Sequence, residues 1–172
     1  EGLTYIGGGN QFVMVEERDR QVSKFTYVAG ATLLRSDVQT VDLGTLVPNI
    51  GIEGISYDPQ TSGFVAVKEI TPQGIFQTGV DFAAGTATNG SAATVDSVNL
   101  FDPALAGLSD FADVFALSNL PSLAGQPQEG NLLVLSQEAG KIVNSDRFGN
   151  ISSSLTIVSD AGNPLSVPNQ QH

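Results

Sequence analysis

Short apolar runs that follow turn sequences form the main pattern along this chain. Residues 12–15 (Phe-Val-Met-Val), 64–67 (Phe-Val-Ala-Val) and 132–135 (Leu-Leu-Val-Leu) each follow a turn that contains glycine, asparagine or proline. Runs this short between such turns predict β-strands in hairpins. Residues 21–28 alternate polar and apolar side chains, which predicts a further strand with one buried face. We therefore expect an all-β protein.

One sequence motif, which we call the repeated phrase, occurs twice along the chain. It begins Glu-Gly, continues through two predicted strands, and ends on a glutamate after the second strand. Its copies occupy residues 1–17 and 53–69, which are 52 positions apart, and a worn third copy occupies residues 110–138. Repeats of roughly 40 to 50 residues made of short strands predict β-propeller blades, each a four-stranded antiparallel sheet.

We expect three blades in a single domain, at about residues 1–52, 53–108 and 109–172. The strands are predicted near residues 3–6, 11–16, 21–28 and 38–43, then 54–57, 64–68, 75–80 and 94–100, then 112–117, 131–136, 141–146 and 151–158. The small polar residues at 83–93 predict an exposed loop, residues 120–130 an insertion, and residues 159–172 a connection to a next blade.

The composition argues against several classes of function. The net charge of -11 opposes binding to nucleic acid and to anionic membranes. The absence of cysteine excludes disulfides and thiolate metal sites, and no apolar run reaches transmembrane length. Because the chain starts inside a repeat unit and stops without a closing strand, we expect a fragment whose native start and signal peptide lie upstream.

The candidate site is a ring of carboxylates. In a propeller the first strand of each blade lines the central channel, so a motif repeated once per blade becomes a ring around the axis. Glutamates open the first strands or follow the second strands at Glu1, Glu53, Glu17, Glu69 and Glu138. Carboxylates gathered in this way repel one another unless a cation neutralises them. Ca²⁺ suits such oxygen ligands, so we nominate these five glutamates as metal ligands.

Two other interpretations of the glutamates stay open. Each could accept hydrogen bonds from a neighbouring strand and lock one blade to the next. Arg18 and Lys68 stand beside Glu17 and Glu69, so a mouth neutralised by ion pairs would need no metal.

The sequence nominates no catalytic residue and no cofactor-binding residue. The one histidine is His172, the last residue, and no nucleophile elbow, phosphate loop or dinucleotide fingerprint occurs. Hydrolysis by a pair of ring carboxylates stays formally open, but nothing selects it.

Three ordered motifs resemble the SdiA-regulated family of bacterial β-propellers. They lie at residues 1–19, at residues 53–69, and at residues 131–138, and the resemblance spans about residues 1–157. It implies a five- or six-bladed propeller, of which this chain is about half, exported to the periplasm or cell surface and without an assigned catalytic activity. A loose kinship with phytase-like and lactonase-like propellers implies a metal at the axis. Where the family's third motif has Ser-Gly, this chain has Ala112 and Asp113.

We therefore expect a periplasmic or extracellular bacterial binding module rather than an enzyme, whose channel-facing glutamates bind a cation such as Ca²⁺ or a small ligand. One alternative is a metal-dependent hydrolase of esters or phosphoesters. A second is a purely structural or adhesive surface domain. The expected partners are the small ligand or cation, and either the remainder of the polypeptide or a second copy of the chain that closes the propeller. Nucleic acid and membrane insertion are not expected.

Overall fold

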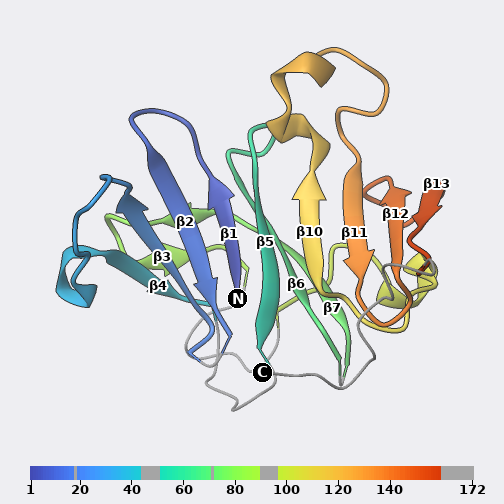
Figure 1. Cartoon of the computed structure of the whole chain (residues 1–172), viewed down its shortest axis with the longest axis horizontal. Coiled ribbons are helices and arrows are strands. Elements are labelled where there is room, and N and C mark those ends of the chain that lie inside the picture. The colour runs from blue at the N-terminus through green and yellow to red at the C-terminus, as the bar shows by residue number, and fades with distance from the viewer. Residues whose placement is uncertain (18, 44–50, 71, 90–96, 160–172) are drawn as a thin grey trace.

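The computed structural model describes residues 1–17, 19–43, 51–70, 72–89 and 97–159. This part of the chain is all-β: antiparallel sheets joined by turns and short 3-10 segments, without an α-helix. It contains no helix with the length and apolar character needed to cross a membrane. Three sheets radiate from neighbouring inner strands as blades of a propeller, and the predicted fold class is confirmed (Figure 1).

The first blade is a four-stranded meander. Its strands are β1 (Gly2–Tyr5), β2 (Gln11–Glu16), β3 (Gln21–Thr26) and β4 (Gln39–Asp42), in that order across the sheet. The 3-10 turn η1 (Arg35–Asp37) precedes β4. The β1–β2 turn places Gly7, Gly8, Gly9 and Asn10 at positive φ, which explains why the hairpin needs three glycines and an asparagine.

The middle blade has three strands in one sheet: β5 (Ile52–Asp58), β6 (Gly63–Lys68) and β7 (Gly74–Thr78). The fourth strand predicted at 94–100 is wrong for residues 97–100, which form no strand, while residues 94–96 lie outside the described ranges. The Ile75 N–H donates to the side-chain oxygen of Asn99 instead of to a backbone carbonyl, and only the Leu100 N–H returns a backbone hydrogen bond, to Ile75 O. This segment therefore runs along β7 without a ladder.

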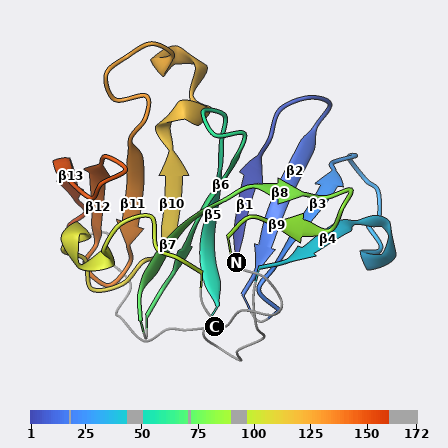
Figure 2. The ribbon, with the colours of Figure 1, turned by 180° about the vertical axis from the view of Figure 1, so that it is seen from behind.

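A small hairpin follows where the sequence predicted a loop. Strands β8 (Val80–Asp81) and β9 (Thr86–Ala87) pair with each other, so the described part of residues 83–93 is not all loop. Apolar side chains of the hairpin pack against the core beside the first blade, and Figure 2, the view from behind, shows β8 and β9 crossing in front of the strands of that blade. Residues 90–93 lie outside the described ranges.

The third blade is again a four-stranded meander. Its strands are β10 (Asp113–Ala116), β11 (Leu132–Ser136), β12 (Lys141–Ser145) and β13 (Ile151–Thr156). The 3-10 turn η2 (Pro103–Ala106) precedes it. Between β10 and β11, η3 (Leu117–Asn119) lies just before the insertion predicted at residues 120–130, and η4 (Pro121–Leu123) lies within it. Of the connection predicted at residues 159–172, residues 160–172 lie outside the described ranges.

Hydroxyl groups of the repeated phrase join the inner strands β1, β5 and β10, which lie side by side (Figure 1). The Tyr57 N–H donates to Thr4 Oγ1 at 2.8 Å, and the Ala116 N–H donates to Ser56 Oγ at 2.9 Å. Thr4 and Ser56 are the same position of the two copies. The first and the middle blade therefore each offer a hydroxyl to the blade that follows, which satisfies a backbone N–H at the junction.

The glycines of the phrase let these strands approach closely. A Cβ on Gly2 would lie 2.8 Å from Ile55 N, and a Cβ on Gly54 would lie 2.6 Å from the Asp113 Cα. Contacts this short with backbone cannot be relieved by a side-chain rotation. The Gly and Ser/Thr of the twice-written phrase are thus explained by blade packing alone.

Two hydrophobic cores lie between consecutive blades. The first joins the first and middle blades, and its side chains include Val13, Val15, Val22, Ile55, Phe64 and Ala66. The second joins the middle and third blades, and its side chains include Val65, Val67, Ile75, Val114, Leu132 and Val134. Alternate residues of β6 therefore enter different cores, because neighbouring strand residues point to opposite faces.

A buried ion pair also joins the middle and third blades. Arg147 Nη2 lies 2.8 Å from Asp58 Oδ2, and the Asp58 side chain is fully buried. This contact is an ion pair without hydrogen-bond geometry at Nη2. Asp58 also accepts hydrogen bonds from Ser118 Oγ and Thr61 Oγ1, both at 2.7 Å. The buried carboxylate is thus compensated by a cation and by hydroxyl donors, as burial requires.

Candidate functional site

The predicted glutamates lie at one end of the inner strands. Glu1 and Glu53 stand where β1 and β5 begin, while Glu17, Glu69 and Glu138 follow the ends of β2, β6 and β11. Because each inner strand is antiparallel to the second strand of its blade, both sets belong to the same end of the sheets, the lower end in Figure 1. The repeat therefore places them along one edge of three blades.

Backbone contacts fix Glu17 and Glu69 at the junctions between blades. A Cβ on Gly51 would lie 1.9 Å from Glu17 O, so the backbone that enters β5 passes directly against this residue. One junction further on, the Phe111 N–H donates to Glu69 O at 3.3 Å. The glutamates thus do contribute to blade locking, but through their backbone carbonyls, which leaves their carboxylates to other roles.

Glu53 is a partly buried carboxyl group with a second carboxyl beside it. Its side chain is 22% exposed, and Oε2 lies 3.4 Å from the amino group of Glu1. Burial raises the pKa of Glu53; the neighbouring amino group opposes this shift, and the charge of Glu17 together with a hydrogen bond between the two carboxyls adds to it. Carboxyl groups from two blades therefore share one small volume.

Glu69 lies in the field of four other carboxylates. Burial raises its pKa first, and the charges that raise it further are those of Glu53, Asp110, Glu138 and Glu17, in that order. These groups come from all three blades. The structure therefore brings four of the five nominated glutamates into one electrostatic neighbourhood. The fifth, Glu1, has an exposed side chain, and it is its amino group that lies beside Glu53.

Asp110 belongs to this neighbourhood although the sequence did not nominate it. It is buried, with 1% of its surface exposed. It accepts hydrogen bonds from the Ser136 hydroxyl and from the backbone N–H groups of Gln137 and Glu138, each at 3.1 Å. Asp110 thus holds the β11–β12 turn, and with it Glu138. Nothing in the local pattern marks this contact, because its partners lie 26 to 28 residues away.

The structure aligns the third copy of the repeat differently from the sequence comparison, which began it at Asp110. Gly54 packs on Asp113 as Gly2 packs on Gly54. The Ala116 N–H donates to Ser56 as the Tyr57 N–H donates to Thr4, so the position equivalent to Glu53 is Ala112. The third blade thus presents an alanine where the first two present Glu1 and Glu53. Its acidic contribution comes from Asp110 before the strand and Glu138 after the next one.

The donor chemistry fits a hard divalent cation, since every group is a carboxylate oxygen. Within the described ranges, however, no three metal-ligating side chains lie close enough together to hold one ion. Arg18, considered as a neutralising partner, lies outside those ranges. The arrangement is therefore an acidic edge without a formed coordination shell among the described residues.

Antiparallel blades around adjoining inner strands, with an acidic end, define the class of the protein as a β-propeller-type repeat protein. The family model named SdiA-regulated matches residues 1–168, and the chain belongs to the SdiA-regulated family. A solved structure of a protein of unknown function from Bacteroides caccae is similar, with a TM-score of 0.46 and 11% sequence identity. The match covers 92% of this chain and 46% of that chain, so this chain spans about half its length. No curated protein matches the chain.

Proposed function

We propose that the chain is a non-catalytic binding module of an exported bacterial propeller, and that its acidic edge takes up a divalent cation such as Ca²⁺ or a small cationic ligand. The observation that supports the proposal most is the state of Glu69, whose pKa is raised by burial and by four surrounding carboxylates. A site of this kind is destabilised by its own ionised groups, and a bound cation would offset the repulsion.

The positions of these carboxylates favour an ion-binding role over a purely structural one. The hydroxyls of Thr4 and Ser56 and the carbonyl of Glu69 already make hydrogen bonds across the blade junctions. The carboxylates of Glu53 and Glu69 are not needed for those contacts. A cation would gain ligands from two blades at once, and so would stabilise the folded chain relative to the unfolded one.

Titration with Ca²⁺ tests this proposal directly. Calorimetry and thermal unfolding at pH 7 should show heat and a rise in melting temperature for the wild type. The double variant Glu53→Gln/Glu69→Gln should lose both responses. Asp37→Asn, which removes one exposed negative charge from η1, should keep them and serves as the matched control. Absence of heat and of stabilisation in the wild type would remove the cation proposal.

The hydrolase alternative gains no particular support from the described residues, and it stays a prediction. An ester and phosphoester substrate panel with added metal ions would test it.

A further inference from the structure

The buried ion pair between Asp58 and Arg147 lies at the end of the sheets opposite to the acidic edge, and it gathers several segments around it. Arg147 Nε donates to Gly130 O at 3.0 Å, and Nη1 donates to Gln77 Oε1 at 2.9 Å. Ser118 Oγ donates to the Asp58 carboxylate. One pair of charges therefore holds together β7, both ends of the β10–β11 connection, and the turns that follow β5 and β12.

The repeated phrase gives the first blade an apolar residue at the position of Asp58. Asp58 stands directly after Tyr57 at the end of β5, and Ile6 stands directly after Tyr5 at the end of β1, 52 residues earlier. Ile6 is partly buried and packs against the core between the first and middle blades. The same position is thus a fully buried carboxylate in one blade and an aliphatic side chain in the other.

The sheet registers identify the counterpart of Arg147 in the middle blade. Because Ala116 takes the position of Tyr57, their partners in the second strands, Leu132 and Phe64, are equivalent. Counted onward along the second and third strands, the further equivalent pairs are Leu133 and Val65, Leu135 and Val67, and Ser145 and Thr78.

The counterpart of Arg147 is Val80. Each of the two stands two residues beyond the end of the third strand of its blade. Val80 is partly buried and packs against the same core as Ile6. The junction between the first and middle blades therefore has two aliphatic residues where the next junction has a carboxylate and a guanidinium.

The connections between the blades differ as well. Residues 43–51 join β4 to β5, whereas residues 79–112 join β7 to β10. At about 3.6 Å per residue at most, the first connection spans no more than roughly 30 Å, which keeps the first and middle blades adjacent. The second connection is long enough to reach past a neighbouring blade. Chain length thus fixes the first junction and leaves the second one open, and the second is the junction with the charged pair.

We propose that the Asp58–Arg147 pair determines blade order, by selecting the third blade as the neighbour of the middle one. If the third blade docked on the first blade, Arg147 would come to lie in the place of Val80, where the first blade offers Ile6 and no carboxylate. A guanidinium buried without a counter-charge is costly. A blade without Arg147 would likewise leave Asp58 uncompensated. The pair thus excludes wrong neighbours more than it adds stability. This inference does not depend on cation binding.

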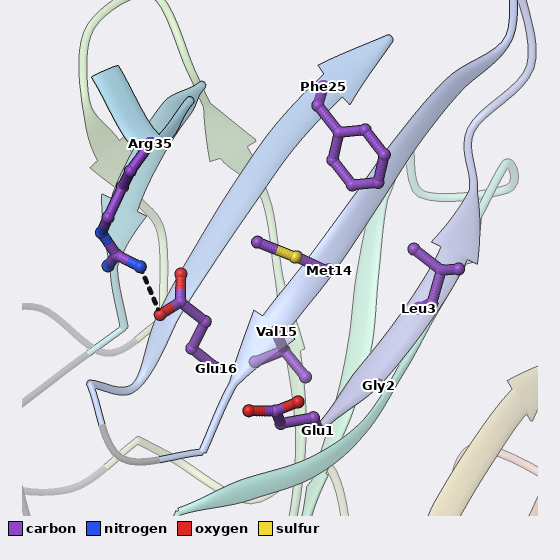
Figure 3. A pocket seen from close by; sticks show the side chains of 8 residues that line it. All are labelled: Glu1, Gly2, Leu3, Met14, Val15, Glu16, Phe25 and Arg35. Atoms are coloured by element: carbon purple, nitrogen blue, oxygen red, sulfur yellow. Dashed lines mark hydrogen bonds and ion pairs between the residues drawn. The ribbon is translucent and has the colours of Figure 1, made fainter. Parts of the chain in front are cut away.

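The ion pair of Arg35 with Glu16 supplies a matched control. Its Nη1–Oε2 distance is 2.7 Å, but the Arg35 side chain is 59% exposed, and Figure 3 shows the pair at the border of a hollow on the first blade. Water can take the place of either partner there, so such a pair selects little. Arg35→Val removes a guanidinium with an equally short contact from an exposed position.

Thermal unfolding tests whether the two buried charges act together. Asp58→Ile and Arg147→Val should each lower the melting temperature by about 10 °C, because each leaves the other charge without its partner. The double variant, which has aliphatic residues as at the first junction, should recover at least about half of that loss. Arg35→Val should melt within about 2 °C of the wild type. A double variant that melts no later than either single variant would overturn the proposal.

The distance between the first and third blades reports blade order. The chain has no cysteine, so spin labels can be attached through Gln39→Cys in β4 and Ser153→Cys in β13, both at exposed positions. After refolding from urea, pulsed electron paramagnetic resonance should give one distance distribution in the labelled wild-type background. Asp58→Ile/Arg147→Val should give additional distances, from chains whose third blade has docked elsewhere. A single distribution identical to that of the wild type would overturn the proposal.

Arg147→Lys separates selection from stability. A lysine keeps a positive charge opposite Asp58 but loses the hydrogen bonds of the guanidinium to Gly130 and Gln77, so the melting temperature should fall by roughly 5 °C. The distance distribution of this variant should nevertheless stay single, as in the wild type. Additional distances would show that hydrogen-bond geometry and not charge selects the third blade, and the proposal would then be wrong.

Discussion

The middle blade and its two flanking blades have similar sequences but different burial. In β6, five consecutive residues from Gly63 to Val67 are buried, whereas β2 and β11 alternate buried and partly exposed residues. The difference comes from neighbours, since the middle blade has a sheet on each side and the others have one. Both faces of a propeller strand are thus buried when a blade packs on each side of its sheet. The strand's own sheet does not bury them.

Pairs of equivalent residues make the same point. Val67 and Leu135 occupy the same place in successive blades, yet Val67 is fully buried and Leu135 is not. The larger apolar side chain sits at the less buried position. The sequence therefore keeps apolar residues on both faces of a flanking blade, including the face that no described residue covers.

The largest effect should come from separating the middle blade from the third. Gly54→Val would place a Cβ 2.6 Å from the Asp113 Cα and 3.0 Å from Val114 N, where neither backbone can retreat without opening the core. We expect a loss of about 4 kcal/mol or more, which corresponds to a fall of roughly 10–15 °C in the midpoint of thermal unfolding.

Gly130→Ala is the matched control for that variant. Its Cβ would meet only Gln60 Oε1 at 3.4 Å, an ordinary contact, and its backbone is not at positive φ. The melting temperature of this variant should stay within about 2 °C of the wild type. A Gly54→Val chain that melts as late as Gly130→Ala would show that close inner-strand approach does not hold the blades together.

An intermediate effect should distinguish equivalent apolar positions. Val65→Ala in the middle blade removes atoms from a closed core and should cost about 2 kcal/mol, whereas Leu133→Ala in the third blade should cost about 1 kcal/mol or less. Urea unfolding measures both costs. Equal costs for the two substitutions would contradict the contrast.

Much of this fold could be predicted from the sequence because its signals are local. The hairpin turns, the short apolar runs and the 52-residue register gave all four strands of the first and third blades, and the first three of the middle blade. Residues 97–100 were mispredicted because Asn99 uses its side chain to bond Ile75, which no alternation of apolar residues reveals. The β8–β9 hairpin was missed because its stability comes from packing on another blade.

The candidate site was predictable only in part, for the same reason. The repeat put Glu17 and Glu69 at equivalent junctions, and their placement at one end of the sheets follows from strand direction. Asp110 could not be predicted as a member of the site, since its hydrogen-bond partners are distant in sequence. The role of Gly2 and Thr4 was not predicted either: the glutamates of the repeat were nominated as ligands, while its Gly and Thr/Ser positions join one blade to the next.

The smallest effect concerns charge, at Glu69 in the middle blade and Glu138 in the third. Because the pKa of Glu69 is raised in the folded chain, the folded state holds its proton more tightly than the unfolded state does. Between the ordinary glutamate pKa, about 4.3, and the raised value, stability therefore falls as pH rises. Glu69→Gln removes this loss, and should raise the melting temperature at pH 7 by roughly 2 °C, with little difference below about pH 4.

Glu138→Gln provides the flanking comparison. Glu138 is exposed, so its replacement should stabilise the chain less, and only by relieving the repulsion that it exerts on Glu69. Melting curves of both variants from pH 4 to pH 8, without divalent cations, measure the two effects. A Glu69→Gln chain that is less stable than the wild type at pH 7 would mean that favourable contacts stabilise this carboxylate. There would then be no repulsion at the acidic edge for a bound cation to offset.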